Sequence, residues 1–384
     1  MDKVSSLWRL YLSKPLVFFL LIAITLSSVP SAYARSGCFE PVSNIYEWLS
    51  PAVVFISAVD ISSTKRTERV SNVIGSGFVI EKDGIVLTNS HVVFGLRSIN
   101  VTMDNGDTVD AIVIGVDPVL DLAVLRVPVP PEGLTTIPLG DSERMRVGDQ
   151  VMAIGNPFGL EQTLTVGVVS GINRILSVAP LSLSIPLIQT DTAINPGSSG
   201  GPLLNRCGEA IGITTAILGA AQNISFALPI NLAKKYLPQL IKKGRVIRPW
   251  IGVSGKLINK DLEDIFNLSV VDGFLVETVD PGSPADHVGI QEGSLPVSVG
   301  GMDFILGGDI ITAINDHPLR DEEMLESLLN TLKVGDKLNL AVFHDGDSRN
   351  VKLSLIERPV LSGDLAPRDQ NLFLLPMRHR TYQY

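Results

Sequence analysis

The feature that most constrains the fold is a succession of short apolar runs, rich in β-branched residues and separated by turn signals. Residues 52 to 59 form one run, and residues 75 to 80 lead through Asp83-Gly84 into another run at residues 85 to 88. An Asp-Gly pair between two apolar runs is typical of a β-hairpin. Short strands at this spacing, with no long helical period, predict an all-β barrel pair.

Composition indicates a well-cored protein. The 384 residues predict two or three domains, and 45% hydrophobic with 18% charged residues excludes a disordered chain. A net charge of −9 argues against nucleic acid as a partner, because no basic stripe is available to meet phosphate. The chain has no paired-histidine zinc motif, phosphate-binding glycine loop or cysteine cluster, so we expect no metal and no cofactor.

A serine between glycines is the strongest chemical signal in the chain. It lies in Asn195-Pro196-Gly197-Ser198-Ser199-Gly200-Gly201-Pro202. Such a turn exposes one hydroxyl and lets successive backbone N–H groups point the same way, as an oxyanion hole requires. A plain β-turn has the same composition, so the assignment depends on partners elsewhere in the chain.

A nucleophilic serine needs a base and a group that orients the base. His91 is the only histidine upstream of Ser199, and Asp121 begins a strand-like apolar run. The order His, Asp, Ser is that of the chymotrypsin arrangement. We therefore predict His91 as base, Asp121 as its orienting carboxylate and Ser199 as nucleophile. Asp117, the rival carboxylate, precedes Pro118, and we expect it to cap that turn.

Three segments around these residues resemble the catalytic blocks of the HtrA/Deg family of serine proteases. They read Thr-Asn-Ser-His-Val-Val at 88–93, Asp-Leu-Ala-Val-Leu at 121–125 and Gly-Ser-Ser-Gly-Gly-Pro-Leu at 197–203. The resemblance covers about residues 46 to 358. It implies a chymotrypsin-like double β-barrel over residues 46–245, followed by one PDZ domain over residues 249–358.

The resemblance also implies further site residues in the protease region. The family usually has Asn before the nucleophile, where this chain has Ser198, whose N–H is still present. The oxyanion hole is expected from Gly197, Ser199 and Ser198, and the substrate pocket from Ala193, Ile194, Ile213, Thr214 and Thr215. The pocket floor carries no charge, so we expect a small or medium aliphatic substrate residue. Asp191 is interpreted as a loop charge facing solvent or a loop partner.

In the PDZ region, the resemblance assigns the carboxylate-binding loop to Trp250, Ile251, Gly252 and Val253. Its N–H groups are expected to bind a hydrophobic peptide C-terminus while the next strand pairs with the peptide. We expect an extra loop at residues 291–307. Helical patterns cover residues 321–332 and, before the domain, residues 231–241, where Asn231 is the expected N-cap.

The N-terminus is typical of an export signal. Basic residues precede an apolar run at residues 16–26, and Ala32-Tyr33-Ala34 supplies a small-x-small cleavage site. We predict a signal peptide over residues 1–34, an N-terminal segment at 35–45 and a periplasmic location. The alternative is an uncleaved anchor in the inner membrane.

The sequence leaves two features undecided, the state of the cysteines and the role of the C-terminal tail. Cys38 and Cys207 are the only cysteines, and in an oxidising periplasm they either pair or remain isolated thiols. The tail, residues 359–384, has mixed apolar and basic character and no assigned role.

The sequence thus predicts a periplasmic serine endopeptidase that cleaves unfolded or damaged exported proteins in stress response and protein quality control. The resemblance implies a homotrimer whose PDZ domains bind peptide tails or regulate activity. Two alternatives remain: a peptide-binding, chaperone-like protein with a mostly inactive triad, and a membrane-anchored stress sensor that cleaves one specific protein.

Overall fold

The computed structural model describes residues 38, 40–61, 70–156, 162–175, 185–217, 223–266, 268, 272–361 and 364. The predicted signal peptide and almost all of the predicted tail lie outside these residues. Within the described part of the chain, no helix is both long enough and apolar enough to cross a membrane.

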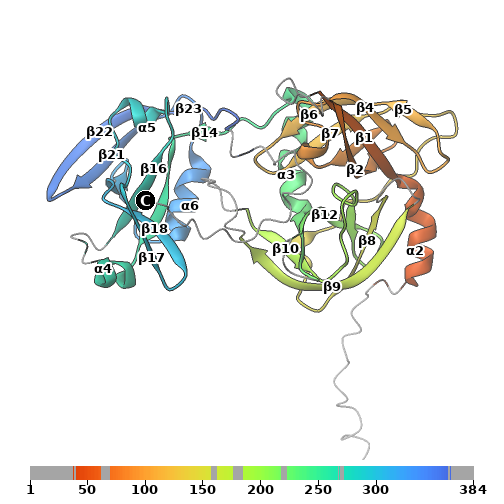
Figure 1. Cartoon of the computed structure of the whole chain (residues 1–384), viewed down its shortest axis with the longest axis horizontal. Coiled ribbons are helices and arrows are strands. Elements are labelled where there is room, and N and C mark those ends of the chain that lie inside the picture. The colour runs from red at the N-terminus through yellow and green to blue at the C-terminus, as the bar shows by residue number, and fades with distance from the viewer. Residues whose placement is uncertain are drawn as a thin grey trace, which may run out of the picture. The chain divides into compact units, whose positions relative to one another are not determined.

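The strands between residues 53 and 126 form a seven-stranded antiparallel sheet in the order β5-β4-β1-β2-β3-β7-β6 (Figure 1). The strands are β1 (Val53–Ile61), β2 (Val70–Glu81), β3 (Ile85–Thr88), β4 (Arg97–Thr102), β5 (Thr108–Asp110), β6 (Ile112–Asp117) and β7 (Leu122–Arg126). The hairpin predicted at Asp83-Gly84 joins β2 to β3, and Gly84 has the positive φ of 88° that such a turn favours. That prediction is confirmed.

The next six strands close into a barrel in the order β10-β13-β12-β11-β8-β9 (Figure 1). They are β8 (Gln150–Gly155), β9 (Thr163–Arg174), β10 (Leu187–Thr190), β11 (Pro202–Leu204), β12 (Ala210–Ile217) and β13 (Ser225–Pro229). Their inward residues share one core cluster with the first sheet, containing Phe78 and Leu87 from the sheet and Met152 and Leu204 from the barrel. This shared core stabilises the two β-structures as one unit.

Two helices complete this region, α2 (Val42–Leu49) and α3 (Ile230–Lys243). The helix predicted at residues 231–241 is present, but the N-cap prediction is wrong. The helix begins at Ile230 after Pro229, because proline fits the start of a helix where its missing N–H is not needed. The Asn231 amide instead donates to Oδ1 of Asp141 at 2.7 Å and so ties α3 to the short 3-10 turn at Ser142–Arg144, before β8.

The C-terminal region is built on a second, separate sheet. Its strands run β15-β16-β19-β21-β22, with β20 beside β19. They are β15 (Val253–Ile258), β16 (Gly273–Val279), β19 (Ile310–Ile314), β20 (His317–Pro318), β21 (Lys337–His344) and β22 (Asp347–Ser354). The helices are α4 (Lys260–Phe266), α5 (Pro284–His287) and α6 (Glu322–Thr331), and a small two-stranded sheet pairs β14 (Pro249–Trp250) with β23 (Ile356–Glu357).

The segment expected as an extra loop at residues 291–307 is a β-hairpin of its own. Its strands are β17 (Leu295–Val299) and β18 (Met302–Leu306), paired in register from Leu295 opposite Leu306. The helix α6 confirms the helical pattern at residues 321–332, and Asp321 caps it by accepting from the Met324 N–H.

Candidate functional site

The pairing of β3 with β7 brings His91 and Asp121 together. These strands are antiparallel, with Thr88 opposite Ala123. The end of β3 therefore lies beside the start of β7. His91 follows β3 by three residues, in a short 3-10 turn, and Asp121 immediately precedes β7. Two residues thirty positions apart are thus neighbours because of the register of one strand pair.

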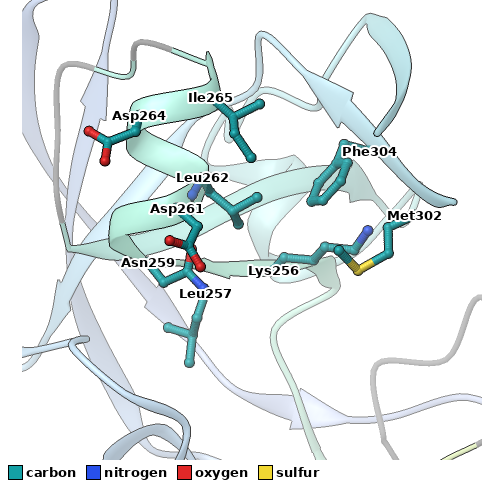
Figure 2. Close-up of a pocket in the computed structure, with 9 residues that line it drawn as sticks. All are labelled: Lys256, Leu257, Asn259, Asp261, Leu262, Asp264, Ile265, Met302 and Phe304. Atoms are coloured by element: carbon teal, nitrogen blue, oxygen red, sulfur yellow. Dashed lines mark hydrogen bonds between the residues drawn. The ribbon is translucent and has the colours of Figure 1, made fainter. Parts of the chain in front are cut away.

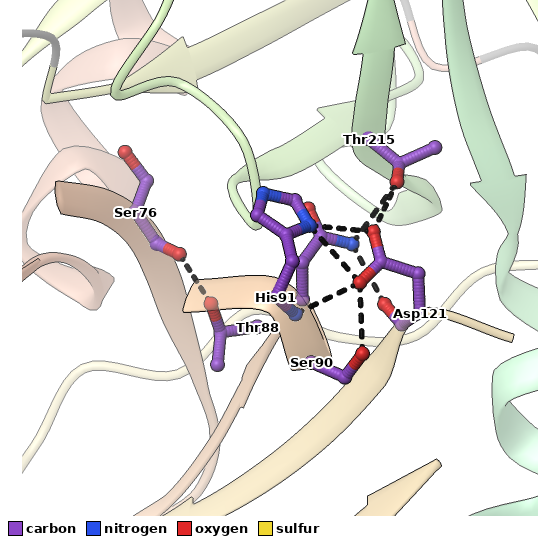
Figure 3. A network of polar contacts seen from close by, with 7 residues as sticks. Ser76, Thr88, Ser90, His91, Asp121 and Thr215 are labelled. Atoms are coloured by element: carbon purple, nitrogen blue, oxygen red, sulfur yellow. Dashed lines mark hydrogen bonds and ion pairs between the residues drawn. The ribbon is translucent and has the colours of Figure 1, made fainter. Parts of the chain in front are cut away.

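The side chains of His91 and Asp121 are in close contact, and a backbone hydrogen bond also joins the two residues. Nδ1 of His91 lies 2.8 Å from Oδ2 of Asp121 and 3.0 Å from Oδ1. The backbone N–H of His91 also donates to Oδ1, at 3.0 Å (Figure 3). The His91 side chain is only 13% exposed. The carboxylate can therefore hold the imidazole in the tautomer with Nε2 unprotonated, which is the form that accepts a proton.

Three neighbours fix the position of Asp121. The Ser90 hydroxyl donates to Oδ1 at 2.9 Å, and the Thr215 hydroxyl donates to Oδ2 at 2.7 Å (Figure 3). The Asn89 amide donates to the backbone carbonyl of Asp121 at 2.8 Å. Asp121 itself has a φ of 54°, an uncommon conformation for a residue other than glycine. This bond network outweighs the backbone strain at Asp121.

The two groups shift each other's pKa. Burial lowers the pKa of His91, but the negative charge of Asp121 and its hydrogen bond outweigh burial, so the pKa lies above its ordinary value. Burial raises the pKa of Asp121, but the charge and hydrogen bonds of His91, with the Thr215 hydroxyl, hold it below the ordinary range. The carboxylate is therefore ionised throughout the neutral pH range.

The serine loop packs directly against the histidine loop. The Ser76 N–H donates to the carbonyl of Ser199 at 2.8 Å, and the Thr88 hydroxyl donates to the carbonyl of Ser76 at 2.7 Å. Gly200 has a φ of 89°, and a Cβ there would lie 2.2 Å from the Ser76 carbonyl oxygen and 3.1 Å from the Asn89 nitrogen. Only glycine allows this approach. The structure thus brings all three predicted triad segments together.

The loop before Ser199 has a defined turn. The Ser198 N–H donates to the carbonyl of Asn195 at 2.8 Å, with Gly197 at a φ of 94°. The Gly197 carbonyl accepts a hydrogen bond from the Ser76 hydroxyl, at 2.6 Å. Within the described part of the chain, the N–H groups of Gly197 and Ser199 make no hydrogen bond, whereas that of Ser198 is used by the turn.

The residues expected to form the substrate pocket have different environments. Ala193 is exposed and Ile194 is buried, while Ile213 belongs to the main core cluster. The Thr214 hydroxyl donates to the carbonyl of Ser198 at 2.7 Å, and the Thr215 hydroxyl is the donor to Asp121 described above. Two of the five therefore hold the predicted catalytic loops in place.

The loop charge Asp191 has a defined partner. Its Oδ1 accepts from the backbone N–H of Val168 in β9, at 2.7 Å. The partner is thus a strand N–H and not a loop residue, while the side chain is exposed, as expected of a charge that faces solvent.

Asp117 has a partner that the sequence did not indicate. The expectation that it caps a turn is wrong: both carboxylate oxygens accept from the Arg248 guanidinium, at 2.8 and 2.6 Å. Asp117 is 3% exposed, so this is a buried, bidentate ion pair. Arg248 lies 131 residues further along, immediately before β14, and no local pattern links the two.

The predicted carboxylate-binding loop lies between β14 and β15. Gly252 has a φ of 87°, and a Cβ there would lie 2.0 Å from the Ser283 Cβ. The Trp250 indole donates to Asp280 at 3.2 Å and the ring is buried. Among the described residues, no hydrogen bond uses the N–H groups of Ile251 or Gly252. These donors are free for a carboxylate.

Among the described residues, no three His, Cys, Asp or Glu side chains gather in a way that could hold a metal ion.

The two cysteines, Cys38 and Cys207, are both disulfide-bonded. Of the two possibilities that the sequence left open, pairing and isolated thiols, the structure therefore shows pairing.

Comparisons with known proteins agree with both halves of the fold. Residues 75–213 match the family described as trypsin-like peptidase domain, and residues 249–355 match the PDZ domain. The chain is 37% identical over 322 residues to "Protease Do-like 1, chloroplastic" from Arabidopsis thaliana, covering 82% of this chain and 71% of that protein. The chain belongs to the HtrA family of trypsin-like serine proteases. The resemblance and the fold predicted from sequence are thereby confirmed.

Solved structures of HtrA proteases extend the comparison. The structure titled "HtrA-type protease AlgW with decapeptide" has a TM-score of 0.65 at 30% identity and covers 84% of this chain and 100% of its own. The serine endoprotease from Yersinia pestis has a TM-score of 0.61 at 31% identity, over 83% of this chain.

The curated DegP-like relatives extend beyond the region that this chain matches. The "Probable periplasmic serine endoprotease DegP-like" of Halomonas elongata is 36% identical over 314 residues, covering 79% of this chain but 62% of the relative. The chain therefore spans about three fifths of the length of such relatives.

Proposed function

We propose that the protein is an HtrA-type serine endopeptidase that cleaves unfolded or damaged exported proteins. The observation that carries this proposal is the pair of contacts between His91 and Asp121, one from the ring and one from the backbone. The Ser199 loop lies nearby: its carbonyl accepts from Ser76 of β2, and Gly200 packs closely against Asn89, two residues before His91. In the proposed mechanism the Asp121 carboxylate, the His91 base and the Ser199 hydroxyl act together, as acyl transfer requires.

The mechanism follows from these positions. His91 takes the hydroxyl proton of Ser199 as the oxygen attacks a peptide carbonyl, and then delivers that proton to the leaving amine. Asp121 orients the imidazole and stabilises the imidazolium that forms. The N–H groups of Gly197 and Ser199 hold the developing oxyanion. Ser198 supports the hole through its turn and not as a donor, because its N–H already bonds to Asn195.

Substrate selection follows from the uncharged walls of the pocket. We propose that residues 193–194 and 213–215 receive a small or medium aliphatic side chain, since none of them carries a charge. The PDZ domain binds hydrophobic peptide C-termini at the loop from Trp250 to Val253, through N–H groups that the domain leaves unused. Pairing of the peptide with β15 then supplies further hydrogen bonds.

We further propose a periplasmic location, a cleaved signal peptide over residues 1–34 and a homotrimer. The names of the bacterial relatives support the location. The residue at the mature N-terminus, read by sequencing of protein from a periplasmic extract, separates cleavage from anchoring. The oligomer is measured by light scattering of the Ser199→Ala chain.

The proteolytic role is tested by incubation with unfolded casein. The wild-type protein is expected to release peptides and Ser199→Ala to release none, with equal binding of casein by both. If wild type and variant both suppress casein aggregation and neither cuts it, the chaperone-like alternative holds and the protease proposal is wrong.

A further inference from the structure

The PDZ domain has an open pocket away from the predicted carboxylate-binding loop. Its volume is about 510 Å³. Its walls come from the end of β15, from α4 and from β18 of the inserted hairpin (Figure 2). The lining residues are Lys256, Leu257, Asn259, Asp261, Leu262, Asp264, Ile265, Met302 and Phe304.

The pocket crosses the free edge of β15. In its sheet, β15 is an end strand, and β16 is its only strand neighbour among the residues that the structure describes. Lys256 and Leu257 are consecutive, so their side chains point to opposite faces of that sheet. Lys256 lies over the Phe304 ring, whereas Leu257 packs against the core cluster on the other face. A pocket that both residues line must therefore lie across the edge, where an added strand would run.

The direction of a bound peptide leads to this pocket. With its carboxylate at the loop before Val253, a peptide runs antiparallel to β15, so its upstream residues advance towards Ile258. Antiparallel strands pair one residue opposite one, so the peptide residue opposite Ile258 lies roughly five positions before its C-terminus. The stretch roughly four to seven positions before the carboxylate reaches α4 and the hairpin.

The chemistry of the pocket is apolar with an acidic rim. Ile265 and Met302 are 53% and 59% exposed, large values for apolar side chains that face one opening. Lys256, the one cation among the nine lining residues, is engaged by Glu277 and by the Asp303 carbonyl.

The carboxylates of the rim are accessible. Asp264 pairs with Lys260 at 2.9 Å in an exposed contact, which contributes little in water. Asp261 is exposed and makes no ion pair with any described residue. The rim therefore favours a positively charged partner, and the floor favours an apolar side chain.

We propose that this pocket is an upstream subsite for peptides bound by the PDZ domain. It takes an apolar side chain flanked by Lys or Arg, roughly four to seven residues before the peptide carboxylate. The inserted hairpin, through Met302 and Phe304, supplies one wall of the subsite. The proposal rests on the peptide-binding role proposed above for the PDZ domain.

The test compares two peptides by fluorescence anisotropy on the full-length Ser199→Ala chain. One is a tetrapeptide with a hydrophobic C-terminus. The other is a decapeptide that ends in the same four residues and carries Lys-Leu-Lys immediately before them. We expect the decapeptide to bind about tenfold more tightly, which is about the contribution of one buried apolar side chain.

Variants of the pocket test whether the higher affinity of the decapeptide arises there. Ile265→Ser, and Asp261→Asn combined with Asp264→Asn, are expected to reduce the tenfold gain to about twofold and to leave the tetrapeptide unchanged. Asp345→Asn is the control, because it removes one exposed carboxylate on the turn between β21 and β22. It should change neither affinity.

The outcomes separate the two proposals. Equal affinity of the two peptides, or a decapeptide gain that survives both pocket variants, would overturn the subsite while leaving the PDZ role intact. A decapeptide with Glu in place of both Lys residues should lose most of the gain, and equal binding would refute the acidic rim. If neither peptide binds, or if an amidated tetrapeptide binds as well as the free acid, the PDZ role fails and the subsite with it.

Discussion

The Thr215 hydroxyl donates a 2.7 Å hydrogen bond to Oδ2 of Asp121 and so joins the closed barrel to the sheet that carries the histidine. Thr215 lies on β12 of the barrel, whereas Asp121 immediately precedes β7 of the sheet. The carboxylate is thus positioned from both β-structures at once, and the geometry of the triad depends on how they pack.

This bond predicts the effect of Thr215→Val, which keeps the shape of the side chain and removes the donor. A hydrogen bond to a charged group contributes about 1.5–3 kcal/mol, so we expect kcat/KM for a casein-derived peptide to fall at least about tenfold. Thr215→Ser retains the donor and should stay within about threefold of wild type. A valine variant with full activity would show that the bond is dispensable.

The pH dependence of activity follows from the raised pKa of His91. The base acts only when neutral, so activity is lost as pH falls through this pKa. Because Asp121 raises it, the acid limb of kcat/KM should have its midpoint above about 6.5, the ordinary value for histidine. In Ser90→Ala, which leaves Asp121 ionised but less restrained, the midpoint should stay above that value. A midpoint below it in wild type would contradict the assigned pair.

Stability should respond to pH in a defined window. The pKa of His91 is higher in the folded state, so its contribution is fully present below about pH 6.5 and is lost as pH rises through the folded-state pKa. The pKa of Asp121 is lower in the folded state than in the unfolded state. Its contribution to stability is therefore present above about pH 3.9 and is lost as pH falls through the folded-state pKa.

The two contributions overlap between about pH 4 and 6.5. The test compares the unfolding free energy of Ser199→Ala, which avoids self-cleavage, with that of the double variant Ser199→Ala/His91→Gln. The single variant should be the more stable, and the difference between the two should be largest in that window. The measurement is denaturant unfolding across pH. A difference that does not vary with pH would rule out the linkage.

Gly200 should be intolerant of any side chain. In Gly200→Ala the new Cβ meets the Ser76 carbonyl at 2.2 Å, in a backbone conformation that disfavours side chains. We expect a loss of about 3 kcal/mol or more in unfolding free energy, together with loss of most activity. Gly106→Ala is the matched control, since its φ of 86° is similar and nothing lies within 4 Å. It should lose only about 1–2 kcal/mol and keep its activity.

Substitutions in the two ion pairs should have different effects: loss of the Asp121 charge should impair catalysis, and disruption of the Asp117 pair should reduce stability. Asp121→Asn is expected to lower kcat by about 10⁴ because the imidazole loses its tautomer control. Arg248→Ala leaves the Asp117 carboxylate buried without its partner and should cost about 3–5 kcal/mol of stability. Asp117→Asn should restore part of that loss in the double variant, with kcat of the folded protein within about threefold of wild type. If Asp117→Asn alone abolished cleavage, the triad assignment would be wrong.

Much of the fold was predictable because its signals are local. The Asp-Gly turn at 83–84, the capped helix α6 and the hairpin of β21 and β22 each depend on residues close together in the sequence. The triad candidates were also accessible, since catalysis restricts the residue types that can serve as base, orienting group and nucleophile.

Contacts between distant segments were not predictable in the same way. The bond from Asn89 to Thr215 spans 126 positions, and the pair of Asp117 with Arg248 spans 131. A carboxylate before Pro118 has the same local pattern whether it caps a turn or binds an arginine from another element. The N-cap error at Asn231 has a similar cause, because the partner that recruits its amide, Asp141, lies 90 positions away.

The most direct test of the central claim is covalent labelling by a serine-directed phosphonate in the presence of a hydrophobic C-terminal peptide, followed by mass spectrometry of the digested protein. The account predicts one labelled residue, Ser199, with no labelling in His91→Ala and at least about a hundredfold slower labelling in Asp121→Asn. Labelling at another residue, or labelling of Ser199 that does not depend on His91, would contradict it.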